Sequence, residues 1–422
     1  MPERQLTVFI YLPGHTTAVP AGIFTHDADA GMGRFDYGRR YLERPNALPV
    51  DPVALPLGVV QRDATINEGL YGTLCDAAPD YWGRLVIAAE RRTAPEAMSE
   101  FDFLLSGNAT RVGNLDFRMS PTDPEPVLEP PSFNQLHDIV LAAERVEEGD
   151  TSDVRLLRLL RQGTSVGGAR PKCTVELDCA LWIAKFPAKE DTVSIPRIEY
   201  ATMKLAQQCG ICIPELRLVQ AGGKDIYLVH RSDRERQGSG WLRHGFLSSL
   251  SLMEWDVRDR LLWEYPGLAA RMRRHMGAGH LVELFRRMVF NVLVRNTDDH
   301  PRNHGFLVRE GEIELSPAYD IVPTLTQAGV GTEFRLAMSV GDEGREATLA
   351  NARSRSAQFG LSAHDAKRLI DGMHATCREW HTCFREAGVS ERDIEIVAPS
   401  MPSASGTPNG SSDPSGGNAS IT

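Results

Sequence analysis

Residues 296–320 constrain the fold of this chain most strongly, because their polar side chains can meet only through a short loop and a returning strand. The segment reads N-T-D-D-H-P-R-N-H-G-F-L-V-R-E-G-E-I-E-L-S-P-A-Y-D. Asp298 and Asn303 are separated by four residues, and a second strand then delivers Asp320. A β-turn between two strands would return Asp320 to the side of the loop. We therefore expect these three side chains to lie together.

This group of side chains has the chemistry that phosphoryl transfer from ATP requires. A carboxylate accepts the proton of the attacking hydroxyl, while an amide oxygen and a second carboxylate hold Mg²⁺ on the phosphates. The catalytic loops of kinases supply these groups as D-x-x-x-x-N followed by a later Asp. The spacing alone is also typical of a plain polar loop, so the interpretation depends on elements elsewhere in the chain.

A glycine-rich segment upstream, G-T-S-V-G-G-A-R-P-K at residues 163–172, is the first of these elements. Glycines let backbone N–H groups approach phosphate oxygens, and a terminal Lys adds a positive charge. Residues 173–177 and 181–186 then predict two paired strands with a turn at 178–180. Lys185 ends the second strand, where kinases carry the lysine that orients the phosphates. The alternative is a plain turn followed by an edge-strand lysine.

Residues 163–167 also match G-x-S-x-G, the nucleophile elbow of serine hydrolases. That motif needs a strand before its serine and a helix after it. Here residues 154–162 have apolar side chains at helical spacing, and strands are predicted afterwards. The context is reversed, which disfavours a hydrolase.

Four blocks of the sequence resemble the HipA-type serine/threonine kinases, the toxins of bacterial toxin–antitoxin pairs. They occur in family order and read S-V-G-G-A-R-P-K, I-A-K-F-P, N-T-D-D-H-P-R-N-H-G-F and L-S-P-A-Y-D-I-V-P-T. L-C-D-A-A-P-D-Y-W-G-R-L-V-I and F-D-F-L-L-S-G are similar to the N-terminal subdomain of that family. The resemblance covers nearly the whole chain.

The resemblance implies a role for each matching residue. Asp298 would be the catalytic base, Asn303 and Asp320 the magnesium ligands, and Ser165 an autophosphorylated serine whose modification inactivates the enzyme. The residues implied to contact ATP are Gly167, Gly168, Ala169, Arg170, Pro171, Lys172, Lys185, His230, Arg231, Ser232, His300, Asn303, Tyr319 and Asp320. The cofactors would be ATP and Mg²⁺.

The adenine hinge departs from the family pattern. The family commonly has V-E-R-F-D-R, whereas residues 229–234 read V-H-R-S-D-R. Backbone contacts to adenine would survive this difference, but the apolar wall that Phe gives the base is absent. The sequence therefore predicts that the hinge difference affects the affinity for the nucleotide and removes no catalytic group.

The implied fold is α+β, with a two-lobed protein-kinase-like architecture, an N-terminal α/β subdomain and a largely helical C-terminal lobe. The expected divisions are a HipA-like subdomain at 1–120, a linker and helix at 121–150, an N-lobe at 151–235, a C-lobe at 236–397 and a disordered tail at 398–422. Within them we expect strands at 6–12 and 19–24 and helices at 71–92, 99–105, 133–148, 154–162, 197–209 and 280–294. Glu199 could pair with Lys185 or lie exposed.

Composition excludes some classes of protein. A formal net charge of −10 argues against autonomous nucleic-acid binding, which needs a concentrated basic face. No apolar run approaches the ~18 residues of a membrane-spanning helix, and seven cysteines without framework spacing fit reduced thiols in a cytoplasmic protein. We expect Cys209, in C-G-I-C, to end a helix closed by Gly210. A later cluster fits a packed helix better than a zinc site: His374, Cys377, His381 and Cys383.

The leading hypothesis is a cytoplasmic serine/threonine-protein kinase that acts as a toxin and phosphorylates a protein, expected to belong to translation. By the resemblance, its partner would be a small helix-turn-helix, HipB-like antitoxin, and operator DNA would be bound only through that partner. Two alternatives remain open: a kinase for a small molecule or lipid, and a catalytically weak corepressor that works with a DNA-binding protein.

Overall fold

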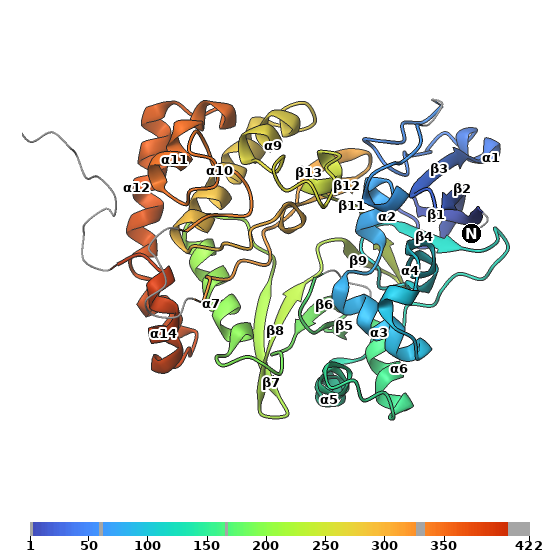
Figure 1. The fold of residues 1–422 in the computed structure, drawn as a ribbon, viewed down its shortest axis with the longest axis horizontal. Helices are drawn as coiled ribbons and strands as arrows, with labels where there is room; N and C mark the ends of the chain where they lie inside the picture. Colours follow the sequence, from blue (N-terminus) through green and yellow to red (C-terminus); the bar gives the residue numbers. More distant parts are fainter. Residues whose placement is uncertain (1–2, 59–61, 165–167, 326–333, 404–422) are drawn as a thin grey trace, which may run out of the picture.

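The computed structural model describes residues 3–58, 62–164, 168–325 and 334–403. The N-terminal subdomain, the strand-rich N-lobe and the helical C-lobe lie side by side, with the N-lobe sheet between and below the other two in the view of Figure 1. The predicted α+β, two-lobed architecture is confirmed. Of the residues predicted to carry function, Ser165 and Gly167 lie outside the described ranges.

The N-terminal subdomain is an antiparallel sheet in the order β3-β2-β1-β4. Its strands are β1 (Arg4–Tyr11), β2 (Ala18–Asp27), β3 (Met32–Tyr37) and β4 (Leu115–Arg118). Short helix α1 (Arg39–Leu42) follows β3, and α2 (Gly72–Ala77) and α4 (Glu100–Ser106) add Leu74, Phe101 and Leu104 to a core shared with Phe24 and Phe35 of the sheet. The predicted first two strands are therefore confirmed.

The helix predicted at 71–92 is two helices, α2 and α3 (Tyr81–Arg91), and the prediction of one continuous helix is wrong. Pro79 restricts Ala78 to extended backbone, with φ −73° and ψ 152°. Asp80 is also extended, with φ −78° and ψ −173°, and becomes the N-cap of α3. Asp80 therefore lies at the break between the two helices, which matters for the site described below.

The N-lobe is an antiparallel sheet in the order β5-β6-β8-β7. Its strands are β5 (Lys172–Leu177), β6 (Ala180–Lys185), β7 (Leu216–Ala221) and β8 (Lys224–His230). Helices α5 (Leu136–Glu147) and α6 (Val154–Gly163) bury one face of it, with Trp182 and Leu228 in the shared core. Helix α7 (Ile195–Gln208) packs against the opposite face, where Tyr227 and Val229 join the C-lobe core.

The β5–β6 hairpin fixes which side chains face α7. Asp178 and Cys179 adopt left-handed φ values of 52° and 57°, as a two-residue hairpin turn requires. The resulting register sets Lys172 opposite Lys185, and Lys185 opposite Tyr227 on β8. Because opposite residues share a face of a sheet, both lysines lie on the α7 side.

The C-lobe is built around α10 (Ala278–Leu293), which is buried along most of its length as predicted. Around it are α8 (Ser249–Leu252), α9 (Tyr265–Met272), α11 (Leu349–Ser354), α12 (Ala363–Cys377), α13 (Trp380–Glu386) and α14 (Glu391–Val397). A small sheet of β11 (Gly245–Ser248), β12 (Gly305–Arg309) and β13 (Glu312–Leu315) includes part of residues 296–320, and β9 (Arg234–Gln237) pairs with β10 (Gly240–Arg243) beside it.

Two further sequence predictions can be compared with the C-lobe. The disordered tail was predicted to begin at residue 398, but Ala398–Ser400 form a 3-10 turn, Ser400 and Met401 are buried, and the Trp380 indole donates to Pro402 O at 3.1 Å. Cys209 caps α7 before a left-handed Gly210, as predicted, and its Sγ lies 3.5 Å from that of buried Cys377. In the described part of the chain, no three His, Cys, Asp or Glu side chains form a metal-binding group.

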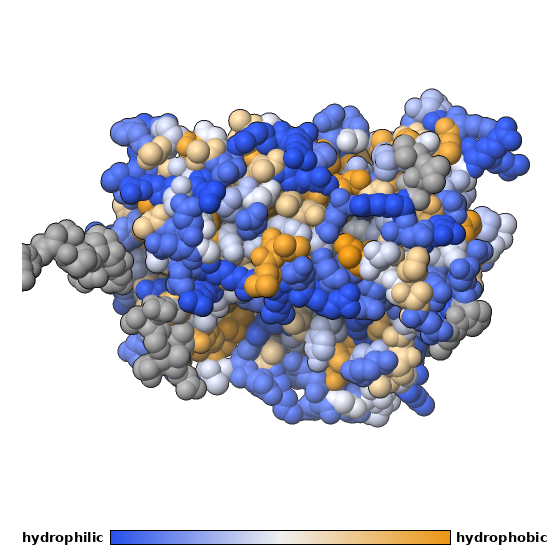
Figure 2. All heavy atoms as spheres, turned by 45° about the horizontal axis from the view of Figure 1, so that its top comes forward, coloured by the Kyte–Doolittle hydropathy of each residue, from blue (hydrophilic) through white to orange (hydrophobic). Residues whose placement is uncertain are grey.

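No helix in the described ranges is both long and apolar enough to cross a membrane. On the face shown in Figure 2, polar and charged side chains predominate, with small apolar groups between them.

Candidate active site

Lys185 lies at the centre of an ion cluster where the N-lobe sheet meets α7 and the C-lobe. Its Nζ is 2.6 Å from Glu199 Oε1 on α7 and 2.7 Å from Asp320 Oδ1. The side chains of Lys185 and Glu199 are only 14% and 5% exposed, whereas that of Asp320 is 37% exposed. Of the two alternatives left open for Glu199, the pair with Lys185 is the one present, and it is buried, whereas Asp320 is the more exposed carboxylate.

Within this cluster, Lys185 and Asp320 favour the ionised form of each other. Burial opposes the charge on Lys185, but Asp320 and Glu199 outweigh burial and raise its pKa. Burial likewise opposes the charge on Asp320, and Lys185 and Lys172 outweigh it and lower the pKa of that carboxyl. Burial lowers the pKa of Lys172, whose side chain lies on the same face of the sheet. Two neighbouring lysines at the end of a hairpin form a site suited to a polyanion.

The loop after α10 is folded around the main chain of Asp298. The backbone N–H of His300 donates to Asp298 O at 2.8 Å, and Asn303 Nδ2 donates to the same oxygen at 3.1 Å. The side chain of Asn303 is thereby oriented within the loop, and Asn303 is 9% exposed. Asp298 itself is exposed, so its carboxylate is accessible to a second molecule.

A buried polar network supports this loop from below. Asp299 accepts from the hydroxyl of Tyr265 and lies 2.8 Å from His304 Nε2. Asn291 on α10 donates to the same hydroxyl at 3.1 Å. Because these groups are buried and mutually hydrogen-bonded, they fix the loop to the C-lobe core.

Two contacts join the loop to the segment that carries Asp320. Tyr319 donates through its hydroxyl to Arg302 O at 2.8 Å, and Thr297 Oγ1 lies 2.6 Å from Thr324 Oγ1. His300 also contributes to lowering the pKa of Asp320. Asp320 has a left-handed φ of 61°, a conformation that Asp tolerates and that is enriched at functional sites. The loop and the β12–β13 hairpin thus bring the three predicted groups to one region.

The described part of the phosphate loop lies against the N-terminal subdomain. Trp82 on α3 donates from its backbone to Gly168 O at 3.2 Å and from its indole to Lys172 O at 2.9 Å. Pro171 O accepts from Phe186 N at 3.0 Å, and Arg170 forms an ion pair with Asp191. Ala169, between Gly168 and Arg170, is the other residue of this loop that is predicted to contact ATP.

The predicted hinge has a second task in the structure. The His230 ring packs edge-on against Trp182 at 5.3 Å, and Ser232 O accepts from Arg309 at 3.4 Å. The guanidinium of Arg231 is buried and binds Asp233, Thr110 O and Arg111 O. The Arg231 side chain is therefore committed to Asp233 and to these carbonyl oxygens, so a contact of Arg231 with a nucleotide would involve its backbone.

Asp80 and Arg302 are functional candidates that the sequence reasoning did not single out. Asp80 Oδ1 pairs with Arg302 NH1 at 2.7 Å, and its Oδ2 accepts from the backbone N–H of Gly168 at 2.7 Å. The only signal for Asp80 in the sequence was the block L-C-D-A-A-P-D-Y-W-G-R, to which no role was assigned. The contact between Asp80 and Arg302 spans 222 residues of sequence.

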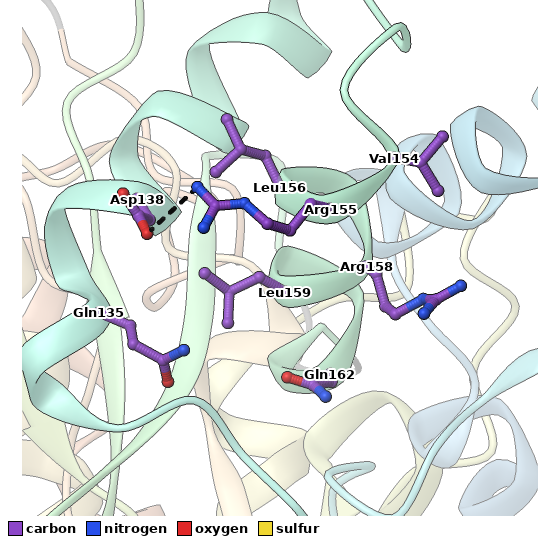
Figure 3. A pocket seen from close by; sticks show the side chains of 8 residues that line it. All are labelled: Gln135, Asp138, Val154, Arg155, Leu156, Arg158, Leu159 and Gln162. Atoms are coloured by element: carbon purple, nitrogen blue, oxygen red, sulfur yellow. Dashed lines mark ion pairs between the residues drawn. The ribbon is translucent and has the colours of Figure 1, made fainter.

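A hollow of about 480 Å³ lies between α5 and α6, lined by eight residues shown in Figure 3. An ion pair between Arg155 and Asp138, at 3.8 Å, lies across it. None of the predicted site residues lines this hollow. It is therefore separate from the site around Lys185 and Asp320.

The fold and the arrangement of Lys185, Glu199, Asp298, Asn303 and Asp320 define a two-lobed, kinase-like protein. Residues 164–380 match the HipA-like C-terminal domain family, which is slightly more than half of the chain. The chain belongs to this family.

Comparisons with known proteins agree with that assignment. The chain is 25% identical over 224 residues to a "Putative kinase" of Haemophilus influenzae, covering 47% of this chain and 64% of that protein. It is 24% identical over 345 residues to "Putative kinase Y4mE" of Sinorhizobium fredii, covering 76% and 78%. A third relative, "Putative kinase Y4dM" of the same organism, is matched over 37% of its length. The chain thus spans less than two thirds of two of these three relatives.

One solved structure matches almost the whole chain. It is the "Toxin Antitoxin System HipA, HipB and its operator DNA complex" of Shewanella oneidensis MR-1, with a TM-score of 0.65 and 18% identity. The match covers 94% of each chain. At this identity the likeness establishes the fold.

Proposed function

We propose that this protein is an ATP-dependent serine/threonine-protein kinase. The observation that carries the proposal is the ion cluster of Lys185 with Glu199 and Asp320, placed beside a loop that exposes Asp298. Lys185 and Lys172 would hold the phosphates, and Asp298 would accept the proton of a substrate hydroxyl as it attacks.

The oxygen donors at the site fit Mg²⁺. Asn303 uses its amide nitrogen on Asp298 O, which orients its side-chain oxygen as the atom that could act as a ligand. Asp320 adds a partly exposed carboxylate whose pKa is lowered by the two lysines, against the effect of burial, so that it is ionised at neutral pH. Such hard oxygen ligands suit magnesium. The ion would neutralise phosphate charge, while Asn303 and Asp320 would hold it.

The proposed nucleotide contacts are those that the family resemblance implies, except that the Arg231 side chain is already bound elsewhere. The described part of the phosphate loop, from Gly168 to Lys172, would approach the phosphates, and His300 and Tyr319 would border the site beside Asp320. His230, Arg231 and Ser232 would contact the adenine mainly through backbone atoms, and Arg231 would do so through its backbone because its side chain binds Asp233. Gly167 would belong to the same loop, and Ser165 would be the autophosphorylated residue, because a phosphate placed there adds about −1.5 to −2 charges near those of ATP.

We further propose that the protein is the toxin of a toxin–antitoxin pair and acts on a cytoplasmic protein. The support is the likeness to the Shewanella HipA chain, which was solved with HipB and operator DNA. The partner of this chain would be a HipB-like helix-turn-helix protein, and DNA would be bound through it. A formal net charge of −10 agrees with DNA binding through a partner.

Calorimetry of Mg-ATP binding tests the site directly. Asp320→Asn removes the charge that would hold the metal, so Mg-ATP affinity should fall about tenfold or more. Asp371→Asn, which breaks an exposed ion pair with Lys367 on α12, is the matched control and should bind like the wild type. Equal affinity of Asp320→Asn and the wild type would remove Asp320 from the nucleotide site.

A further inference from the structure

The N-terminal subdomain reaches into the candidate active site through one carboxylate. Asp80 lies at the break between α2 and α3, and its two oxygens contact different lobes. Oδ2 accepts from Gly168 N–H in the phosphate loop of the N-lobe, at 2.7 Å. Oδ1 pairs with Arg302 in the catalytic loop of the C-lobe, also at 2.7 Å. A single side chain therefore joins the two loops.

Local helix structure does not account for these contacts. Asp is a favoured N-cap residue because its carboxylate can accept from the N–H groups of the first turn. Asp80 occupies the N-cap position of α3, yet its side chain makes no capping hydrogen bond. Its oxygens are instead directed across the interface, to Gly168 and Arg302.

Residues on either side of Asp80, in α2 and α3, also contact the two lobes; we call this break between the helices the α2–α3 corner. Asp76, on α2, accepts from the backbone and hydroxyl of Ser248, both at 2.7 Å, at the start of α8 in the C-lobe. Trp82, on α3, donates to Gly168 O and Lys172 O in the N-lobe. The α2–α3 corner thus contacts the C-lobe before Asp80 and the N-lobe after it. These contacts fix the position of Asp80 independently of its own ion pair.

Arg302 links the contact to the segment that carries Asp320. Its backbone oxygen accepts from Tyr319, which precedes Asp320, and its side chain is one residue before that of Asn303. The ion pair of Arg302 with Asp80 is partly buried, with the two side chains 33% and 26% exposed.

We propose that Asp80 is a positioning residue for phosphoryl transfer, which holds the phosphate loop and the catalytic loop in register through Gly168 and Arg302. The proposal rests on the proposed kinase function. Asp80 does not touch the reacting atoms. It sets the distance between the loop that holds the γ-phosphate and the loop that carries Asp298, and a misplacement of about 1 Å in such geometry can cost about a hundredfold in rate.

The test compares Asp80→Asn with the wild type at saturating Mg-ATP. In an amide of the same size, an NH2 donor replaces one of the two oxygens, so the separate contacts of Oδ2 with Gly168 N–H and of Oδ1 with Arg302 cannot both be kept. We expect kcat to fall about ten- to a hundredfold, while the Kd of Mg-ATP changes by about twofold or less. Asp63→Asn, which breaks the exposed pair with Arg34 in the same subdomain, is the matched control and should keep the wild-type rate.

A double variant tests whether Asp80 acts through Arg302. If it does, Asp80→Asn combined with Arg302→Gln should be no slower than Arg302→Gln alone, because the shared contact is already lost. Fully additive losses, or a wild-type kcat in Asp80→Asn, would overturn the proposal. A faster reaction with tighter ATP binding would also overturn it, because Asp80 would then be a competitor of phosphate.

Amide hydrogen exchange separates this proposal from the proposed function. Without nucleotide, the Gly168 N–H should exchange faster in Asp80→Asn than in the wild type and in Asp63→Asn. That result would support the contact even if the wild type transferred no phosphate, an outcome that would instead remove the kinase assignment. Unchanged exchange at Gly168 would show that Asp80 does not hold the loop.

Discussion

At the scale of single residues, Lys185 shows how a functional side chain can depend on a buried partner. Glu199 is 5% exposed, and burial raises its pKa even though Lys185 opposes that effect. A buried ion pair adds little stability compared with apolar residues, but removing one partner leaves a charge without compensation. The pair is therefore better explained by the position it gives Lys185 than by the stability it provides.

Replacing the lysine should separate these two effects. Lys185→Met leaves the Glu199 carboxylate buried without its cation, and we expect a loss of about 3–5 kcal/mol in the free energy of unfolding. Lys185→Met/Glu199→Gln removes both charges and should recover most of that loss. Denaturant unfolding measures both values. If the single and double variants were equally unstable, the two side chains would not be energetically coupled.

At the scale of elements, α6 packs closely on β5 and precedes the predicted phosphate loop. A Cβ added to Gly163, the last residue of α6, would lie 2.2 Å from Cys173 Sγ and 2.4 Å from Thr174 O. Asn108 Nδ2 also donates to Arg161 O and Gln162 O, so the end of this helix is held from the N-terminal subdomain as well. The glycine thus allows the helix to end directly against the strand.

Gly163→Ala should force α6 and β5 apart. We expect a loss of about 1–3 kcal/mol in stability from overpacking, together with weaker Mg-ATP binding, because the displaced helix leads into the phosphate loop. Gly279→Ala is the matched control: it lies in α10 with no atom within 4 Å of the added Cβ, and the change should be neutral or stabilise by up to about 1 kcal/mol. Thermal unfolding and calorimetry distinguish the two variants. Wild-type stability and affinity in Gly163→Ala would contradict the close packing.

The elements that could be predicted from the sequence are those specified by neighbouring residues. The β5–β6 hairpin follows from two apolar runs, but its turn is predicted at 178–180, one residue longer than the two-residue turn at 178–179 that sets Lys172 opposite Lys185. The break at Pro79 was also present in the sequence, but the helical periodicity on both sides was read as one helix. The contact of Asp80 with Arg302 depends on how two subdomains pack, which no local pattern encodes.

At the scale of the whole molecule, the subdomains have separate apolar cores and are joined by buried polar contacts. The core of the N-terminal sheet, that of α5 and α6 with the N-lobe sheet, and that of the C-lobe are distinct. Asp233, beside the hinge, accepts from Gly113 N–H at 3.0 Å and pairs with Arg231 and Arg234. The two arginines in turn bind carbonyl oxygens of residues 110–113. The hinge therefore anchors the N-terminal subdomain.

Asp233→Asn should weaken this anchor. Two buried guanidinium groups would lose their counter-charge, so we expect a loss of about 3–5 kcal/mol in the free energy of unfolding at pH 7. Burial opposes the charge on Asp233, but Arg231 and Arg234 outweigh it and lower its pKa, so the stabilisation is present above about pH 4 and is lost as acid protonates the group. The difference between the variant and the wild type should shrink below that pH. Asp342→Asn, in an exposed pair with Arg355, should show no such difference.

Transfer of labelled γ-phosphate from Mg-ATP, in wild type and Asp298→Asn, tests the central claim most directly. Asp298→Asn keeps the size of the side chain and the backbone contacts of the loop but removes the proton acceptor. The account predicts that the wild type transfers phosphate, and that Asp298→Asn binds Mg-ATP with similar affinity but transfers it about 10²–10⁴ times more slowly. Equal rates in the two proteins, or a wild type that binds Mg-ATP without transferring phosphate to any protein hydroxyl, would contradict it.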